Sequence, residues 1–190
     1  MTSTVIAFHS GYGHTRRLAQ ALADGAAGTR GDEARLLDVA TIDDDAWAAL
    51  AVADAIVFGA PTYMGGASAQ FKAFADASSK VWISQGWKDK VAGGFTCSLN
   101  LTGDKDSTLS WLVTFAMQHG MVWAGLGILP ASDPGDPQAI NRLGAYTGLL
   151  AQADNVPPDQ SPPPGDLDTA AAYGRRIAAL ARRLRSNAGN

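Results

Sequence analysis

The feature that most constrains this fold is the regular alternation of short apolar runs with helical patterns. The runs are rich in aliphatic and β-branched residues, as expected for strands buried on both faces of a parallel sheet. Five are present: TVIAF (4–8), EARLLDV (33–39), ADAIVFGAP (53–61), VAGGFT (91–96) and MVWAGLGIL (121–129). We therefore expect five parallel strands joined by crossover connections.

Between these runs, apolar residues recur at the spacing of one helix face. The clearest case is the last segment, where Tyr173, Ile177, Leu180, Ala181 and Leu184 repeat at helical intervals. Crossovers between parallel strands are right-handed, so a strand order that reverses direction places helices on both faces of the sheet. The pattern predicts an α/β fold with a doubly wound five-stranded parallel sheet, strand order 2-1-3-4-5.

A proline-rich region interrupts this alternation. Residues 130–167 hold eight of the nine prolines, including the run NVPPDQSPPPGD, and such a long loop in a compact domain is usually functional or disordered. The region is either a plain surface excursion, or a subunit contact or wall of the active site. We favour the second interpretation because INRLGAYTGLLA (140–151) carries apolar residues that need cover. We expect one domain over residues 1–190, with this excursion inside it.

Composition limits the classes of partner. With a net charge of −3 and 46% hydrophobic residues, the chain offers no electrostatic case for binding nucleic acid or a membrane. The sequence has no apolar stretch near the ~18 residues of a membrane span, and MTSTVIAF lacks the basic region of a signal peptide. The single cysteine, Cys97, cannot form an internal disulfide, so we expect a cytoplasmic protein, and we predict no metal site.

The stretch HSGYGHT follows the first apolar run and opens a predicted helix. A P-loop is excluded because no lysine follows the second glycine. Gly11 and Gly13 fit a dinucleotide-binding turn, but Arg16 occupies the third glycine position. A phosphomonoester site fits better, since the hydroxyls of Ser10 and Thr15 and the helix N-terminal N–H groups hold an anion without a cationic side chain. Two alternatives stay open: the dinucleotide-binding turn, in which Asp38 would take the place of the ribose-binding acid, and a plain strand-to-helix turn with Thr15 near the cap.

Two further loops should meet this turn, because ligands of doubly wound sheets bind beyond the carboxyl ends of the strands. GAPTYMGGASAQFKAF (59–74) offers Tyr63 and Met64 as surfaces beside a planar ring, with Pro61 stiffening the strand exit. TCSLNLTGDKDST (96–108) supplies hydroxyls and amides for the polar edge of a heterocycle. Together the loops predict one cleft with a phosphate end, an apolar wall and a polar wall.

HSGYGHT, GAPTYMGGASAQFKAF and HGMV (119–122) occur in an order and spacing that resemble the tryptophan-repressor-binding-protein family of flavodoxin-like NAD(P)H:quinone oxidoreductases. The likeness spans about residues 3–185 and implies a flavodoxin-like fold with FMN as the cofactor. It places these residues on FMN: Ser10, Gly11, Tyr12, Gly13, His14 and Thr15 at the phosphate and ribityl chain, and Pro61, Thr62, Tyr63, Met64, Thr96, Cys97, Ser98, Leu99 and Asn100 around the isoalloxazine ring.

The resemblance also implies roles outside these loops. His119 matches the family histidine near the flavin, where it would bind the cofactor and act catalytically by stabilising charge. Trp82 and Tyr12 would border the substrate site. Without the resemblance, a structural role is an equal alternative for His119, and a core or interface position is the commoner one for a residue such as Trp82. Two departures touch the ring walls: Tyr63 stands where the family usually has arginine, and SLNLTGD replaces a glycine-rich run.

The resulting hypothesis is an FMN-dependent oxidoreductase that transfers two electrons from NAD(P)H to a quinone by a ping-pong mechanism, with one cavity serving both substrates. Two alternatives stay open. One is a flavodoxin-like FMN carrier acting on a protein partner, which the mild charge of −3 disfavours; the other is a binding module without flavin. The apolar segment at 140–151 and the family likeness also predict a homodimer or homotetramer.

Overall fold

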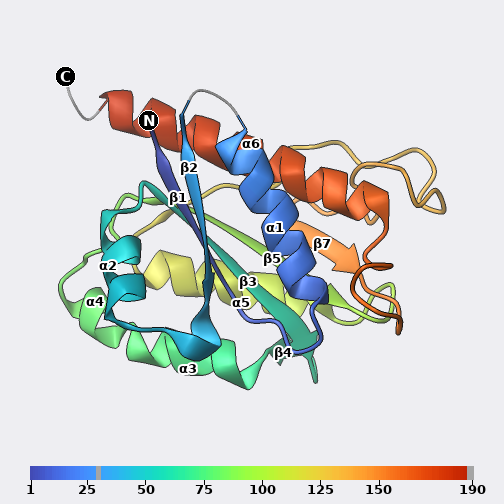
Figure 1. The fold of residues 1–190 in the computed structure, drawn as a ribbon, viewed down its shortest axis with the longest axis horizontal. Coiled ribbons are helices and arrows are strands. Elements are labelled where there is room, and N and C mark those ends of the chain that lie inside the picture. The colour runs from blue at the N-terminus through green and yellow to red at the C-terminus, as the bar shows by residue number, and fades with distance from the viewer. Residues whose placement is uncertain (29–30, 188–190) are drawn as a thin grey trace.

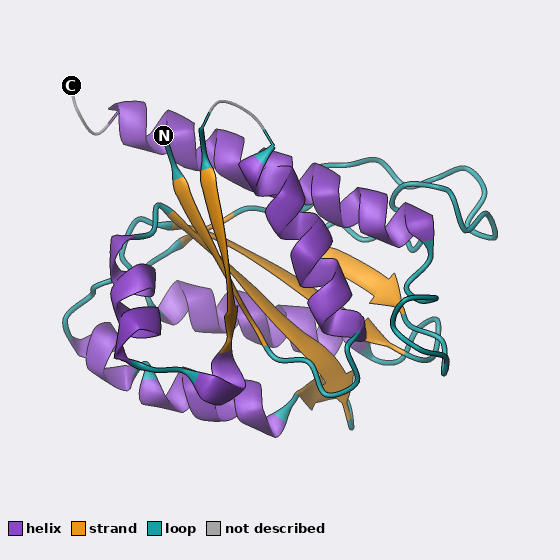
Figure 2. Ribbon diagram, viewed as in Figure 1, coloured by secondary structure: helices purple, strands orange, loops and turns teal. Residues whose placement is uncertain are grey.

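The structure is a computed structural model that describes residues 1–28 and 31–187. Its centre is a parallel sheet with strand order β2-β1-β3-β5-β6, while β4 pairs with β3 and β7 pairs with β5 (Figures 1 and 2). The strands are β1 (Ser3–Phe8), β2 (Glu33–Asp38), β3 (Ala55–Tyr63), β4 (Gly66–Ala67), β5 (Val91–Ser98), β6 (Val122–Trp123) and β7 (Leu149–Gln152). The predicted doubly wound fold class is confirmed.

Helices cover both faces of the sheet. In Figure 1, α1 and α6 lie together on one face, and the remaining helices lie on the other. The helices are α1 (His14–Ala27), α2 (Asp44–Val52), α3 (Ala69–Ala77), α4 (Ser79–Ile83), α5 (Lys105–Gln118) and α6 (Pro164–Asn187), with one 3₁₀ turn at Val39–Thr41. The long α6 covers one face of the sheet, as the periodicity of its apolar residues predicts, and it packs mainly on α1.

The alternation of side chains along β1 divides the core into two layers. Ile6 and Phe8 face α1 and α6, whereas Val5 and Ala7 face the layer that contains the aromatic side chains of α3 and α5. The contact between α1 and α6 is close, because a Cβ atom at Gly25 would overlap the carbonyl of Ala171. Both faces of the central strands β1, β3 and β5 are therefore covered, which explains why these strands read as continuous apolar runs.

The predicted fifth strand, 121–129, is wrong in extent. The amide of Ala124 still donates to the carbonyl of Ala92 at 2.8 Å, but the chain then leaves the sheet, and Gly127 takes a φ of +66°. The first residues of β5, Val91 and Ala92, pair with β6. The last half of β5 pairs with β7, which lies in the proline-rich region, in the register Phe95 to Leu149. The fifth position of the sheet is thus shared by two strands separated by residues 124–148.

This arrangement answers the question of what covers the apolar segment 140–151. Leu149 and Ala151 are fully buried within the sheet of the same chain. Ile140 and Tyr146 stay exposed, at 43% and 60%. Most of the segment is therefore covered within one chain, and Ile140 and Tyr146 are its large apolar side chains that remain available to another molecule.

Candidate functional site

A cavity of about 570 Å³ opens beyond the carboxyl ends of β1, β3, β5 and β7. Its volume is typical of a small-molecule site. The structure brings the three loops singled out in the sequence together here and adds a fourth. The lining residues are Tyr12, His14 and Thr15 from the first loop, Pro61, Thr62 and Tyr63 from the second, Cys97, Ser98 and Leu99 from the third, and 153–158 from the fourth.

The first loop forms a tight turn that leads into α1. Ser10 Oγ accepts hydrogen bonds from the amides of Gly13 and Arg16, each at 3.1 Å. Gly13 has a φ of +93°, and a Cβ atom there would lie 2.8 Å from Pro158 Cγ, so only glycine fits. Because first-turn amides lack intrahelical partners, the amides of His14 and Thr15 are suited to an anion at the helix N-terminus.

Two arginines lie next to this turn, but both are engaged elsewhere. Arg16 Nη2 lies 2.8 Å from Asp38 Oδ2, and Arg17 Nη1 donates to the carbonyl of Pro158 at 2.7 Å. Within the described part of the chain, the residues that line the cavity include neither lysine nor arginine. An anion bound here would be held by hydroxyls, amides and the helix dipole.

The second loop brings Tyr63 over the first. A Cβ atom at Gly11 would lie 2.5 Å from Tyr63 Oη, so the absence of a side chain at Gly11 makes room for this phenol. The rings of Tyr12 and Tyr63 meet edge to face, with centroids 6.4 Å apart. Burial raises the pKa of Tyr63, which therefore keeps its proton at neutral pH. Met64, with a φ of +49°, is fully exposed at the tip of the turn.

The third loop is held by a buried lysine that the sequence analysis did not single out. Lys105 Nζ donates to the carbonyls of Asn100 at 2.6 Å, Leu101 at 2.7 Å and Thr102 at 3.3 Å. Burial lowers the pKa of Lys105. A cation in the first turn of a helix opposes the helix dipole. That position, directly after the hydroxyl-rich loop, was the available signal in the sequence.

Three predicted cofactor residues of this loop have different placements. Cys97 is buried with its Sγ 3.3 Å from Thr15 Oγ1, and burial raises the pKa of its thiol to about 11, so the thiol stays protonated. Thr96 is fully buried and lies behind Thr62 rather than on the cavity surface. Asn100 contributes its carbonyl to Lys105, and its side chain is exposed.

The fourth wall, residues 153–158, comes from the proline-rich excursion. His14 Nε2 lies 2.8 Å from the carbonyl of Val156, and Arg17 binds the carbonyl of Pro158. The excursion thus supplies a wall of the cavity, which was one of its two predicted roles. Sequence reasoning did not identify the individual residues, because they lie 142 and 141 positions from their partners in the first turn.

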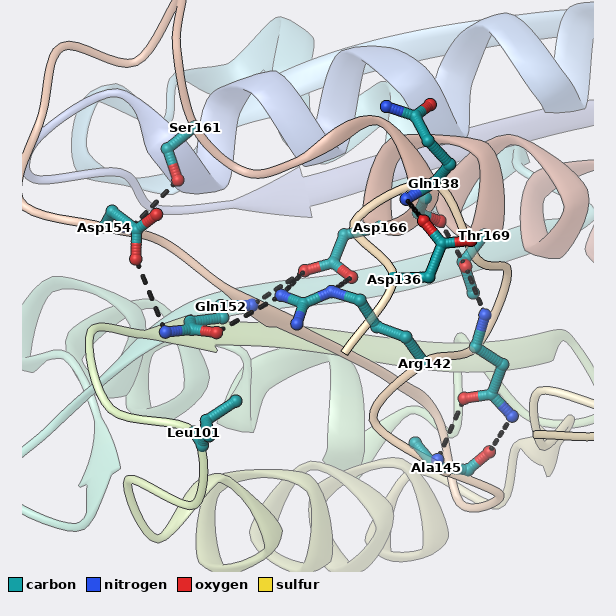
Figure 3. A network of polar contacts seen from close by, with 12 residues as sticks. Leu101, Asp136, Gln138, Arg142, Ala145, Gln152, Asp154, Ser161, Asp166 and Thr169 are labelled. Carbon is teal, nitrogen blue, oxygen red and sulfur yellow. Dashed lines mark hydrogen bonds and ion pairs between the residues drawn. The ribbon is translucent and has the colours of Figure 1, made fainter. Parts of the chain in front are cut away.

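A buried polar network anchors this wall (Figure 3). Arg142 forms a bidentate ion pair with Asp166, with Nε to Oδ1 at 2.8 Å and Nη2 to Oδ2 at 3.1 Å. Asp166 Oδ2 also accepts from the amide of Gln152 at 2.9 Å, and Gln152 Nε2 reaches Asp154 Oδ1 at 3.4 Å. The Asp154 amide donates to Ser161 Oγ at 2.9 Å. The network therefore connects the segment between β6 and β7 (residues 124–148), which we call the insertion, together with α6 and β7, to the fourth wall.

His119 and Trp82 lie away from this cavity. The helix α5 starts at the edge where the cavity opens and runs to the opposite edge, so His119 at its end is carried away from the phosphate turn. His119 Nε2 lies 3.0 Å from Ser78 Oγ, its ring packs 4.4 Å from Trp87, and burial lowers its pKa to about 4. His119 and the half-exposed Trp82 line a separate cavity of about 420 Å³. One chain alone does not place either residue on the predicted flavin.

The His, Cys, Asp and Glu side chains of residues 1–28 and 31–187 form no group of three or more that could hold a metal ion. Across those same ranges, none of the helices is both long enough and apolar enough to span a membrane.

Comparison with known proteins assigns the family. The family model described as a flavodoxin domain matches residues 5–120. Flavodoxin FldP of Pseudomonas aeruginosa is 44% identical, with 97% of this chain and 99% of that protein aligned. An NAD(P)H dehydrogenase (quinone) of Geobacter sulfurreducens is 30% identical over 96% of this chain and 98% of its own.

A solved structure agrees. The flavodoxin, WrbA-like protein of Agrobacterium tumefaciens is 46% identical and superposes with a TM-score of 0.77, covering 96% of this chain and 99% of that one. The fold, the loops at the carboxyl edge of the sheet and these full-length similarities all agree. The chain therefore belongs to the flavodoxin family and resembles its WrbA-like members over nearly its whole length.

Proposed function

We propose that this protein is an FMN-dependent oxidoreductase that transfers two electrons from NAD(P)H to a quinone or a similar acceptor. The observation that carries the proposal is the cavity of about 570 Å³, which combines an anion-binding turn with hydroxyl and aromatic walls. Flavodoxin domains bind FMN, and the family assignment therefore implies that cofactor. The similarity to an NAD(P)H dehydrogenase (quinone), at 30% identity over nearly both full lengths, supports the proposed reaction.

The residues present fit FMN. The turn 10–15 contributes Tyr12, His14 and Thr15 to the cavity, and it offers a hydroxyl and the first-turn amides of α1 to a phosphate monoester. FMN, when bound, supplies the electron-transfer chemistry. We assign the phosphate to the turn 10–15, and the ring to the walls that include Thr62, Tyr63, Ser98 and Leu99.

The role of the chain would then be to bind the flavin, orient its substrates and enclose the site. The fourth wall, 153–158, borders the turn through its contacts to His14 and Arg17 and would enclose that end of the ligand. Tyr12 is largely exposed at the rim and offers a flat surface to a planar substrate. One open cavity would receive NAD(P)H and then the acceptor, so the nucleotide must leave before the acceptor enters.

Flavin binding and steady-state kinetics test this proposal. Titration of the apoprotein should show tighter binding of FMN than of FAD, because no second nucleotide fold is present in the described ranges. With NADH or NADPH and a quinone, double-reciprocal plots at several fixed quinone concentrations should be parallel. Intersecting plots would contradict the shared cavity, and equal or tighter binding of FAD would contradict the assigned cofactor.

A second candidate function is electron carriage. The 44% identical relative carries the name flavodoxin, and on that analogy the chain would pass electrons to a protein partner. Negligible NAD(P)H oxidation by the FMN-loaded protein, with every quinone tested, would favour the carrier over the enzyme. The mild net charge of −3 argues against it, since an electrostatically steered carrier gains from a stronger charge.

We further propose a homodimer or homotetramer in the cytoplasm. Met64 and Leu99 leave apolar surface exposed beside the cavity, and a second copy could cover it. Such an assembly is also the way in which His119 and Trp82 of one chain would approach the flavin of another, as their predicted roles require. The cytoplasmic location rests on the single, buried Cys97.

A further inference from the structure

Three buried threonine hydroxyls meet behind the second loop. Thr62 Oγ1 lies 2.7 Å from Thr96 Oγ1 and 2.8 Å from Thr108 Oγ1. Thr96 and Thr108 are fully buried, whereas Thr62 is 8% exposed and lines the cavity. The three residues come from β3, β5 and α5, so only the folded chain brings them together.

The protons of this cluster can be counted. Three hydroxyls carry three protons, but only two contacts join them. Other helical threonines pair their proton with the backbone: Thr114 Oγ1 and Thr169 Oγ1 each donate to the carbonyl four residues before them, at 3.1 Å and 2.6 Å. In the described part of the chain, Thr96 and Thr108 have no hydrogen-bond partner for their hydroxyls other than Thr62.

The lowest-energy arrangement of these protons follows from burial. A buried hydroxyl that leaves its proton unpaired is costly, so Thr96 and Thr108 each donate to Thr62. A hydroxyl oxygen has two acceptor sites, and both are then occupied at Thr62. The proton of Thr62 is the one left over, and Thr62 is the member of the cluster that lines the cavity.

We propose that Thr96 and Thr108 are positioning residues that fix the Thr62 hydroxyl as a hydrogen-bond donor to the bound ring. The inference rests on the proposed FMN binding and deepens it. An isoalloxazine ring has several oxygen and nitrogen acceptors and one ring N–H donor. A donor-only Thr62 therefore selects an acceptor atom and rejects the N–H, which orients the ring in the cavity.

Stability of the apoprotein tests the cluster without any cofactor. Thr62→Val is nearly isosteric but leaves the protons of Thr96 and Thr108 without an acceptor, so the Tm should fall by roughly 5 °C or more. Replacing all three residues by valine removes the orphaned protons and should restore most of that loss. A Thr62→Val apoprotein as stable as wild type would overturn the donor assignment, as would a triple variant less stable than Thr62→Val.

Flavin affinity tests the action of Thr108 through Thr62. Thr62→Val should weaken FMN binding by about two- to tenfold, the effect of one neutral hydrogen bond, while Thr62→Ser should stay near wild type. Thr108→Val should weaken binding by a smaller factor, because Thr62 loses one of the two donors that polarise it. Thr108→Ser should restore binding, and Thr114→Val, on the same helix, is the matched control.

The decisive measurement is the double variant. If Thr108 acts through Thr62, adding Thr108→Val to Thr62→Val should cause no further loss of FMN affinity. An equal loss on both backgrounds would show a packing effect and overturn the inference. A wild-type protein without affinity for FMN would instead overturn the proposed function and the ligand assigned to Thr62, while the stability of the apoprotein would still test the proton arrangement.

Discussion

At the scale of single residues, burial decides which side chains can act. Cys97 and Thr15 lie against each other beneath the cavity, and the raised pKa of Cys97 keeps its thiol protonated. His119 is buried beside Ser78 and Trp87, and burial is also what lowers its pKa to about 4. Burial thus fixes the protonation state of each residue: Cys97 keeps its proton, and His119 is neutral at pH 7.

Thr15→Val should separate a phosphate anchor from a plain helix start. The substitution nearly conserves volume but removes the hydroxyl of a residue that lines the cavity. A hydrogen bond to a charged group contributes about 1.5–3 kcal/mol, so FMN affinity should fall roughly ten- to hundredfold. Fluorescence titration of the apoprotein measures this, with Thr15→Ser as the control that keeps the hydroxyl. Unchanged affinity in Thr15→Val would place the phosphate elsewhere.

The buried neutral state of His119 predicts a pH dependence of stability. The unfolded chain protonates this histidine near pH 6.5, whereas the folded chain does so only near pH 4. The unfolded state therefore binds more protons in that window, and the free energy of unfolding falls as the pH drops from about 6.5 to about 4.

The check is a comparison of wild type with His119→Gln, which cannot titrate. Urea unfolding at pH 7, 5.5 and 4.5 should show a shallower decline for the variant across this window. Parallel declines for the two proteins would mean that another group is responsible for the acid sensitivity.

At the scale of elements, the split fifth strand shapes the site. Because the chain leaves the sheet after Trp123 and returns as β7, the segment that follows β7 emerges beside the cavity and forms its fourth wall. The ion pair of Arg142 and Asp166 holds this arrangement, since it joins the insertion to the first turn of α6. The insertion and the fourth wall are therefore connected by one hydrogen-bonded network.

Arg142→Met should show how much this unit depends on its ion pair. The substitution leaves Asp166 buried without its cation, which costs about 3–5 kcal/mol of unfolding free energy. Arg142→Met combined with Asp166→Asn should recover most of that loss, since neither charge of the pair remains and the Gln152 amide keeps its acceptor. Urea denaturation measures both variants. A double variant as unstable as the single one would mean that packing, and not charge, holds the insertion.

At the scale of the whole molecule, a single sheet with both faces covered leaves its carboxyl edge as the place for chemistry. That edge carries the cavity, while the opposite edge carries His119 and the second cavity. The exposed apolar residues Met64 and Leu99 lie at the rim of the first cavity. The molecule therefore has one cavity at each end of the sheet, and the anion-binding turn lies at the carboxyl end.

Sedimentation at micromolar concentration should show a dimer or a tetramer. A charge at the rim, Met64→Glu, should shift the protein toward the monomer, because it would bury a carboxylate in the proposed contact. Val52→Glu, at the similarly exposed end of α2, is the control and should leave the assembly unchanged. A wild-type protein that sediments only as a monomer would contradict the proposed assembly.

The sequence alone determined the layout of the fold and three of the four walls of the cavity. Buried parallel strands and amphipathic helices have local signatures, so four strands were found near their observed places. The turn 10–15 and the loops after β3 and β5 could be predicted because ligands of such sheets bind at one known edge.

The tertiary structure decided everything that depends on pairing between distant residues. No local pattern shows that β7 completes β5, that Arg142 meets Asp166, or that the threonines of β3, β5 and α5 share their protons. The same reason explains His119: its sequence motif resembles that of the family, but the length and direction of α5 carry it to the far edge of the sheet. Local periodicity determines elements, and only packing determines which side chains meet.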